Sequence, residues 1–233
     1  MASVNQTMPE QAREVRISAK NVLGGTITES FASGAAIVLA LLGLGGIRPH
    51  LMLPVAVIVM GAAFLFEGIA ISMRFSKLLS ETSQDRLEKA EFGVGLTSEY
   101  LGGITGVILG ILSLLGIAPM ILVPAAAIVF GLAFILSSGV TYRLDSLEIE
   151  GSEESTRVKK IAHEAVKTSA VLEYVLGVGA MVLGIIAIAG VYASTAGFVT
   201  MISLVSLLVV GLAGLVTGAA VTSRMISIFQ KSS

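Results

Sequence analysis

The chain has 233 residues, of which 55% are hydrophobic and only 13% are charged, and its mean hydropathy is +0.91. Since a soluble domain carries about 25% charged residues, this composition is typical of an integral membrane protein. The net charge of −1 gives no sign of nucleic-acid binding. The absence of cysteine excludes disulfides, thiolate catalysis and cysteine-bound metals.

The first 25 residues are polar and mildly basic. They lack the apolar region of a secretory signal peptide, so we expect a cytoplasmic N-terminal segment that is not cleaved.

Six apolar blocks follow, each about long enough for the roughly 20 residues that cross a bilayer as a helix. They are Ser30–Ile47, Leu51–Met73, Tyr100–Ile117, Met120–Tyr142, Tyr174–Tyr192 and Phe198–Met225. Short connections join the blocks in pairs, and long charged connections separate the pairs. The sequence therefore predicts an all-α integral membrane protein with six transmembrane helices in three hairpins.

The three hairpins are internal repeats of one unit. Glu29, Glu99 and Glu173 align without a gap, and each is followed 18 residues later by Ile47, Ile117 or Val191, with a glycine just before it. The spacing from Pro54 to Gly61 matches that from Pro124 to Gly131, and each second helix ends in Ser/Thr-x-Arg. The third repeat lacks the proline and has a longer tip. We expect a pseudo-threefold arrangement of the three units.

Basic residues predict the orientation in the membrane. Of the 15 Lys and Arg, only Arg48 lies at a hairpin tip, so the positive-inside rule places both termini and both long connections in the cytoplasm. The predicted segments are an N-terminal segment 1–25, hairpin 26–75, linker 76–98, hairpin 99–143, linker 144–172, hairpin 173–228 and a C-terminal tail 229–233.

The two linkers contain good helix formers with mixed charge at Ser76–Phe92 and Ser155–Lys167. We interpret them as solvated helical segments that continue the spans. A docking surface for a soluble partner is the alternative.

Glycines at four-residue spacing mark two spans. Gly102, Gly106 and Gly110 form one stripe, and Gly214 and Gly218 form another. Because apolar burial drives helix association only weakly in lipid, small residues that allow close backbone approach predict helix packing faces.

The three aligned glutamates, Glu29, Glu99 and Glu173, are expected at the cytoplasmic start of the odd-numbered helices. A carboxylate there complements the helix dipole. Each even-numbered helix returns an arginine to the same level: Arg74, Arg143 and Arg224. The pattern predicts capping groups or ion pairs at the membrane boundary. The alternative is a ring of three carboxylates around a polar vestibule.

Glu67 lies two helical turns before Arg74, which places it about 10 Å deeper. The equivalent residues in the other repeats are Ser137 and Thr217. An acidic residue inside a membrane span is a candidate for proton or solute handling because its burial is costly. A neutral glutamate that is hydrogen-bonded to a nearby hydroxyl or carbonyl is the simpler interpretation.

Motifs for catalysis are missing from the sequence: it has neither a nucleotide-binding loop nor a histidine pair at metal-ligand spacing. We therefore expect no enzyme activity, no catalytic or metal-binding residues and no cofactor. The expected partners are the lipid bilayer and either further copies of the chain or another membrane protein, and no nucleic acid is expected.

The segment G-I-T-G-V-I-L-G-I-L-S-L-L-G-I-A-P-M-I-L-V-P-A-A-A-I-V-F-G-L-A-F-I-L-S-S-G (Gly103 to Gly139) resembles the hairpin unit of the HdeD-like acid-resistance membrane proteins. That family consists of small bacterial and archaeal proteins with six spans in three such hairpins. The resemblance covers all three pairs, although the charged linkers here are longer. It implies a protein of the prokaryotic cytoplasmic (inner) membrane that is linked to stress or acid tolerance, with no catalytic residues to carry over.

Two functions are compatible with these features. The first is a non-enzymatic structural or accessory protein, which includes a role as a subunit of a larger membrane assembly. The second is a proton, ion or small-solute channel or transporter that uses Glu67 and the plane of Glu29, Glu99 and Glu173.

Overall fold

The computed structural model describes residue 28 and residues 30–81, 86–150, 157–193 and 195–230. Side chains are described for residues 28, 30–68, 98–139, 168–193 and 195–218. Within this part the chain is all-helical, as predicted. Six helices follow one another: an N-terminal helix Ser30–Leu44, then α2 (Pro49–Glu81), α3 (Arg86–Leu114), α4 (Pro119–Glu150), α5 (Arg157–Ala193) and α6 (Ala196–Gln230).

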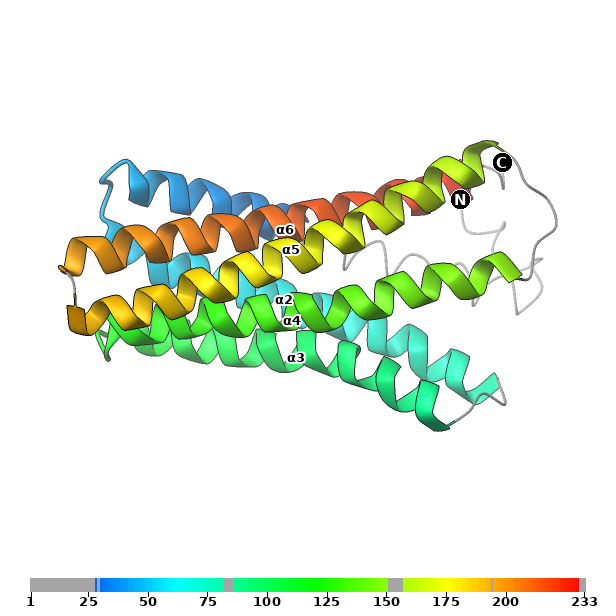
Figure 1. The fold of residues 1–233 in the computed structure, drawn as a ribbon, viewed down its shortest axis with the longest axis horizontal. Helices are drawn as coiled ribbons and strands as arrows, with labels where there is room; N and C mark the ends of the chain where they lie inside the picture. Colours follow the sequence, from blue (N-terminus) through cyan, green and yellow to red (C-terminus); the bar gives the residue numbers. More distant parts are fainter. Residues whose placement is uncertain (1–27, 29, 82–85, 151–156, 194, 231–233) are drawn as a thin grey trace, which may run out of the picture.

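The helices lie side by side along one long axis, and the tight turns between paired helices gather at one end of the molecule (Figure 1). The far ends of α2 to α6 lie at the opposite end. Helices α2 to α5 run well into the segments that the sequence marks as charged linkers. The prediction of helices that continue the spans is confirmed at these residues.

Two of the turns have the same backbone geometry. Gly46 and Gly116 have φ values of 85° and 84°, and the N–H groups of Ile47 and Ile117 donate to carbonyls five residues earlier at 2.9 and 3.0 Å. This is the Schellman ending of a helix, which requires a left-handed residue that glycine supplies most easily. Pro49 and Pro119 then open α2 and α4, where a missing N–H is tolerated.

The third turn differs, as its divergent sequence suggests. Gly190, which aligns with Gly46 and Gly116, lies inside α5, because that helix continues to Ala193. A Cβ atom on Gly190 would lie 3.1 Å from the Phe198 ring of α6. The glycine here permits close packing of two helices and does not form a turn.

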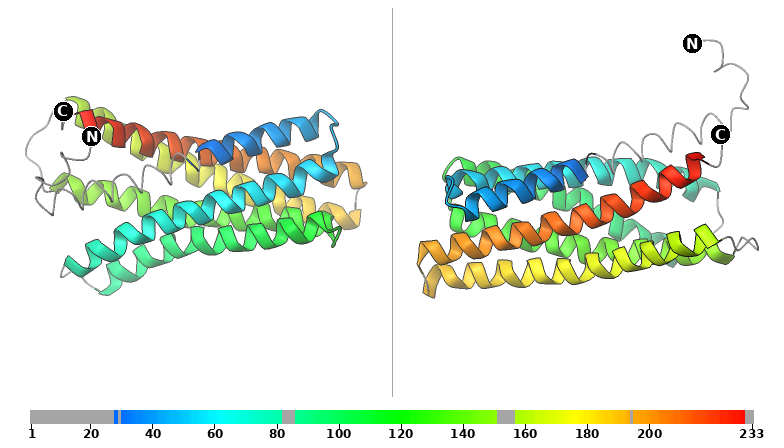
Figure 2. Two further views of the ribbon diagram at one scale, coloured as in Figure 1. Left: turned by 180° about the vertical axis from the view of Figure 1, so that it is seen from behind. Right: turned by 90° about the horizontal axis from the view of Figure 1, so that it is seen from above.

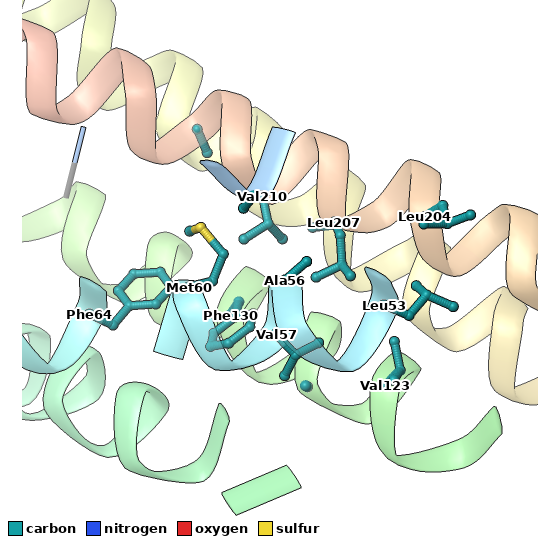
Figure 3. Close-up of a cluster of buried hydrophobic side chains, with 14 of the residues drawn as sticks. Leu53, Ala56, Val57, Met60, Phe64, Val123, Phe130, Leu204, Leu207 and Val210 are labelled. Carbon is teal, nitrogen blue, oxygen red and sulfur yellow. The ribbon is translucent and has the colours of Figure 1, made fainter. Parts of the chain in front are cut away.

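Three helices form the centre of the bundle. Helices α2, α4 and α6 contact one another, while the N-terminal helix, α3 and α5 lie outside them (Figure 2). Apolar side chains from the inner helices fill the space between them, including Leu53, Met60, Phe130, Leu207 and Val210 (Figure 3). The ring centroids of Phe64 and Phe130 lie 5.2 Å apart, and those of Phe64 and Phe134 lie 4.8 Å apart. Over these residues the centre of the bundle is packed.

Each inner helix contacts an outer helix of another hairpin through a glycine. A Cβ atom on Gly61 of α2 would lie 2.9 Å from the carbonyl oxygen of Gly103 on α3. A Cβ atom on Gly131 of α4 would lie 2.5 Å from the carbonyl oxygen of Gly177 on α5. On α6, Gly211 faces the N-terminal helix. A Cβ atom on Gly211 would lie 3.2 Å from the backbone carbonyl oxygen of Ser33. Each close approach requires glycine, because a larger side chain would meet backbone atoms of the neighbouring helix.

The predicted glycine stripe on α3 is divided between two neighbours. Gly102 faces Ala133 of α4, and Gly110 faces Pro54 and Ile58 of α2. The role in helix packing is confirmed for these residues, but they do not share a single partner.

Among the residues that the structure describes, four helical segments are long and apolar enough to cross a membrane: Pro49–Gly68, Pro119–Gly139, Thr168–Ala193 and Ala196–Gly218. The apolar segments Ser30–Leu44 and Ser98–Leu114 are shorter within the described residues. By length and composition, the chain is a multi-pass membrane protein.

Candidate functional site

Polar side chains from five helices gather in the bundle, far from the turns. Their members are Glu67 of α2, Glu99 of α3, Ser137 of α4, Glu173 of α5 and Thr217 of α6, and all five are buried. Glu67 follows Pro49 by 18 residues, as Ser137 follows Pro119. At 1.5 Å per residue this is about 27 Å, close to the thickness of the hydrocarbon layer. We call Glu99, Ser137, Glu173 and Thr217 the carboxyl–hydroxyl cluster.

Ser137 occupies the centre of this cluster. Its hydroxyl group donates a hydrogen bond to Glu173 Oε1, and the same hydroxyl group is hydrogen-bonded to the side chain of Glu99. It also lies 3.3 Å from the backbone carbonyl of Phe134 in its own helix. One serine of α4 therefore joins carboxyl groups that α3 and α5 contribute from either side.

Thr217 extends the cluster to α6. Its hydroxyl group donates to the Ala213 carbonyl at 3.1 Å and also contacts the side chain of Glu173 by a hydrogen bond. Glu67 lies at the same level on α2, because a Cβ atom on the next residue, Gly68, would lie 3.0 Å from the backbone nitrogen of Tyr100. Four of the five residues thus form a continuous chain, and Glu67 lies next to it.

The two glutamates are not at helix starts, so the capping interpretation is wrong for Glu99 and Glu173. Helix α3 begins at Arg86 and α5 at Arg157, which places both glutamates several turns inside their helices. The charge of a helix dipole acts within the first turn only. The predicted ion pairs involve Glu29 and the side chains of Arg74, Arg143 and Arg224, which lie outside the described side chains.

The sequence placed these residues at two depths, whereas the structure brings them to one. Ser137 and Thr217 were expected about 10 Å deeper than the three aligned glutamates, yet both contact Glu173. Distances counted from the turns would have shown this: Glu99 precedes Gly116 by 17 residues, and Glu67 follows Pro49 by 18. Spacing from the turns predicts one level for these residues, whereas spacing from Arg74 predicts two.

Two buried oxygen atoms of the cluster have no hydrogen-bond partner: Oε2 of Glu99 and Oε2 of Glu173. The described residues contain no group of three or more acidic, histidine or cysteine side chains that could hold a metal ion. The arrangement supplies carboxyl and hydroxyl oxygens, which can exchange protons and hydrogen bonds.

Comparison with known proteins adds no relative. No family model, curated protein or solved structure matches the chain.

Proposed function

We propose that the chain is a non-enzymatic multi-pass protein of the prokaryotic cytoplasmic membrane, of the HdeD-like type. In this proposal three repeated hairpins surround a pseudo-threefold axis, with both termini in the cytoplasm. Its role is structural or accessory in stress or acid tolerance, as a subunit of a larger membrane assembly or of a homo-oligomer.

The packed centre of the bundle is the observation that supports this role best. Phe64, Phe130 and Leu207 are fully buried where α2, α4 and α6 meet. Large apolar side chains on the axis favour a solid bundle over a water-filled path. The outer face carries exposed apolar side chains such as Leu101, Val175 and Met201, which suit lipid or another membrane protein.

The repeat and the pseudo-threefold axis draw support from matched contacts. Gly61 with Gly103, Gly131 with Gly177, and Gly211 with Ser33 are equivalent pairs in the alignment of the three hairpins. Each pair joins the second helix of one hairpin to the first helix of another.

Native mass spectrometry of the gently solubilised protein tests the subunit role, with acid survival of an expressing bacterial host measured in parallel. We expect a complex larger than one chain and higher survival than in a host that expresses an unrelated six-span protein at the same level. A lone monomer together with unchanged survival would rule the proposal out.

The carboxyl–hydroxyl cluster supports a second candidate, a proton, ion or small-solute channel or transporter that uses Glu67 and the plane of Glu29, Glu99 and Glu173. Flux into liposomes tests it. Glu67→Gln is expected to lower the flux, and unchanged flux would remove Glu67 from the mechanism. If substitution of all three aligned glutamates impairs folding but not flux, their role is structural.

A further inference from the structure

We propose that Glu99, Ser137 and Glu173 form a proton-binding site, in which one serine hydroxyl joins two carboxyl groups that hold at least one extra proton between them. The proposal goes beyond the accessory role and depends on the cluster alone. It also deepens the second candidate function, because it names the proton as the species bound. It requires no open path through the bundle.

The hydroxyl group of Ser137 has too few protons for the contacts that it makes. A serine hydroxyl group has one proton to donate and two lone pairs that accept. Ser137 contacts both Glu99 and Glu173, and it lies near the Phe134 carbonyl as well. Ionised carboxylates and carbonyls only accept, so one hydroxyl proton can satisfy only one of these contacts. A proton on either carboxyl group lets that group donate to Ser137 and makes both contacts favourable.

Thr217 repeats this arrangement on the other side of Glu173. Its single hydroxyl proton is directed to the Ala213 carbonyl at 3.1 Å, yet its oxygen also contacts Glu173. A protonated Glu173 can donate to the threonine oxygen without disturbing the bond to Ala213.

The buried negative charge of the two carboxyl groups also favours an added proton. Glu99 is 5% exposed and Glu173 is 1% exposed, and the Oε2 atom of each is buried without a hydrogen-bond partner. Two ionised carboxylates in contact with one hydroxyl, away from water, would be strongly unfavourable without a compensating charge. An added proton supplies that charge.

The groups that face the cluster contain no positive charge among the described side chains. Helix α2 contributes Glu67, whereas α4 and α6 contribute only hydroxyl groups. Tyr100 and Tyr174, which follow the two glutamates on α3 and α5, are exposed. Arg48 and His50 lie at a turn, roughly 27 Å away at 1.5 Å per residue. Arg74, Arg143 and Arg224 follow Glu67, Ser137 and Thr217 by six or seven residues, about 10 Å along their helices.

A proton fits the site better than a metal ion. Ser137 Oγ and Glu173 Oε1 are in direct hydrogen-bonding contact, which leaves no room for an ion between them. A Ca²⁺ ion would require about six to eight oxygen ligands at 2.3–2.6 Å, and the described residues offer no group of three carboxylate, histidine or cysteine ligands.

Infrared spectroscopy of the purified protein in lipid nanodiscs tests the proposal. A protonated carboxyl group has a carbonyl-stretch band that ionised carboxylates lack. We expect this band at neutral pH in the unmodified protein, and its loss by half or more in Glu99→Gln or Glu173→Gln. Glu150→Gln, at the end of α4 and outside the apolar span, is the control that leaves the band intact.

A serine pair provides a test that leaves all carboxyl groups in place. Ser137→Ala is expected to shift the band because it removes the hydroxyl group shared by both carboxyl groups. Ser138→Ala is the matched control, since Ser138 is equally buried but donates to the Ile135 carbonyl at 2.9 Å. This pair decides the question alone if a glutamine variant fails to fold by size-exclusion chromatography and circular dichroism.

Three results would overturn the proposal: no band in the unmodified protein at neutral pH, a full band in both glutamine variants, or a band that disappears as Na⁺ is titrated at constant pH. The last result would assign the site to a cation, and the first would favour ion pairs with arginine. A band without proton flux in liposomes would keep the site and reject the transport function, so the two proposals fail separately.

Discussion

Gly46 and Gly34 belong to the same N-terminal hairpin, but their backbones differ. Gly46 has a φ of 85° in the turn after Leu44, where a side chain is strained whatever the space around it. Gly34 lies inside the helix, and a Cβ atom there would have no neighbour within 4 Å. The backbone conformation of the turn requires Gly46, whereas Gly34 only lowers the stability of the helix in which it lies.

We predict that Gly46→Ala lowers the free energy of unfolding by about 1–2 kcal/mol, the cost of placing an L residue in the left-handed region. Gly34→Ala, its matched control, should raise the free energy of unfolding by up to about 1 kcal/mol, because alanine is the better helix former. Equilibrium unfolding in detergent micelles measures both changes. Equal effects of the two substitutions would contradict the assignment of the turn.

Sequence could predict the turn residues, because Gly-Ile-x-Pro occurs twice between apolar blocks and each of its residues has a known preference. It could not predict that Ser137 bonds to Glu173. That contact joins α4 to α5 across two hairpins, and it depends on the rotation of each helix about its axis. The composition of a uniformly apolar span carries little information on that rotation, since lipid and protein neighbours are both apolar.

Helix packing depends on which glycine faces a neighbouring backbone. On α5, Gly177 and Gly179 are two residues apart but point in different directions. A Cβ atom on Gly177 would lie 2.8 Å from the Gly131 carbonyl oxygen, whereas one on Gly179 would lie 3.8 Å from a methyl group of Val209. The first distance is an overlap with backbone, and the second is an ordinary contact.

Gly177→Ala is therefore expected to lower the free energy of unfolding by about 1–3 kcal/mol, the usual cost of overpacking. Gly179→Ala should be neutral or slightly stabilising. Thermal denaturation followed by circular dichroism in micelles would measure the difference between the two. If Gly179→Ala is the more harmful substitution, the packing of α5 on α4 described here is wrong.

The sequence predicted the existence and order of these helices well, because uninterrupted apolar blocks separated by Gly-Pro turns leave few alternatives. It predicted helical linkers that continue the spans, but it placed the starts of α3 and α5 at Glu99 and Glu173. Residues 86–98 and 157–172 are charged and helix-forming, and they extend α3 and α5 beyond the apolar blocks. Hydropathy marks where a span leaves lipid, but a helix ends only where its backbone hydrogen bonds end. This difference misplaced Glu99 and Glu173 at helix starts.

Across the whole molecule, the N-terminal helix and α6 come together although most of the chain separates them. A Cβ atom on Gly211 would lie 2.8 Å from Cγ1 of Ile37. Figure 2 shows the N-terminal helix, in dark blue, beside α6 in orange and red. This contact closes the bundle around the three inner helices.

The closure predicts a disulfide between engineered cysteines at Ile37 and Gly211, in a chain that has no cysteine of its own. The variant Ile37→Cys/Gly211→Cys should cross-link within one chain on mild oxidation, seen as faster migration in non-reducing electrophoresis. Ile37→Cys/Leu212→Cys is the control that should not cross-link, because Leu212 is exposed on the outer face. Cross-linking of the control alone would place the N-terminal helix elsewhere.

The contact between Gly211 and Ser33 has no covalent segment beside it, unlike the contacts of α2 with α3 and of α4 with α5. Van der Waals packing in the lipid phase holds it together without help from the chain. By the same argument, the loop that joins one hairpin to the next is dispensable for assembly. Two separately translated fragments, cut between α2 and α3, should therefore find each other in the membrane and rebuild the complete bundle.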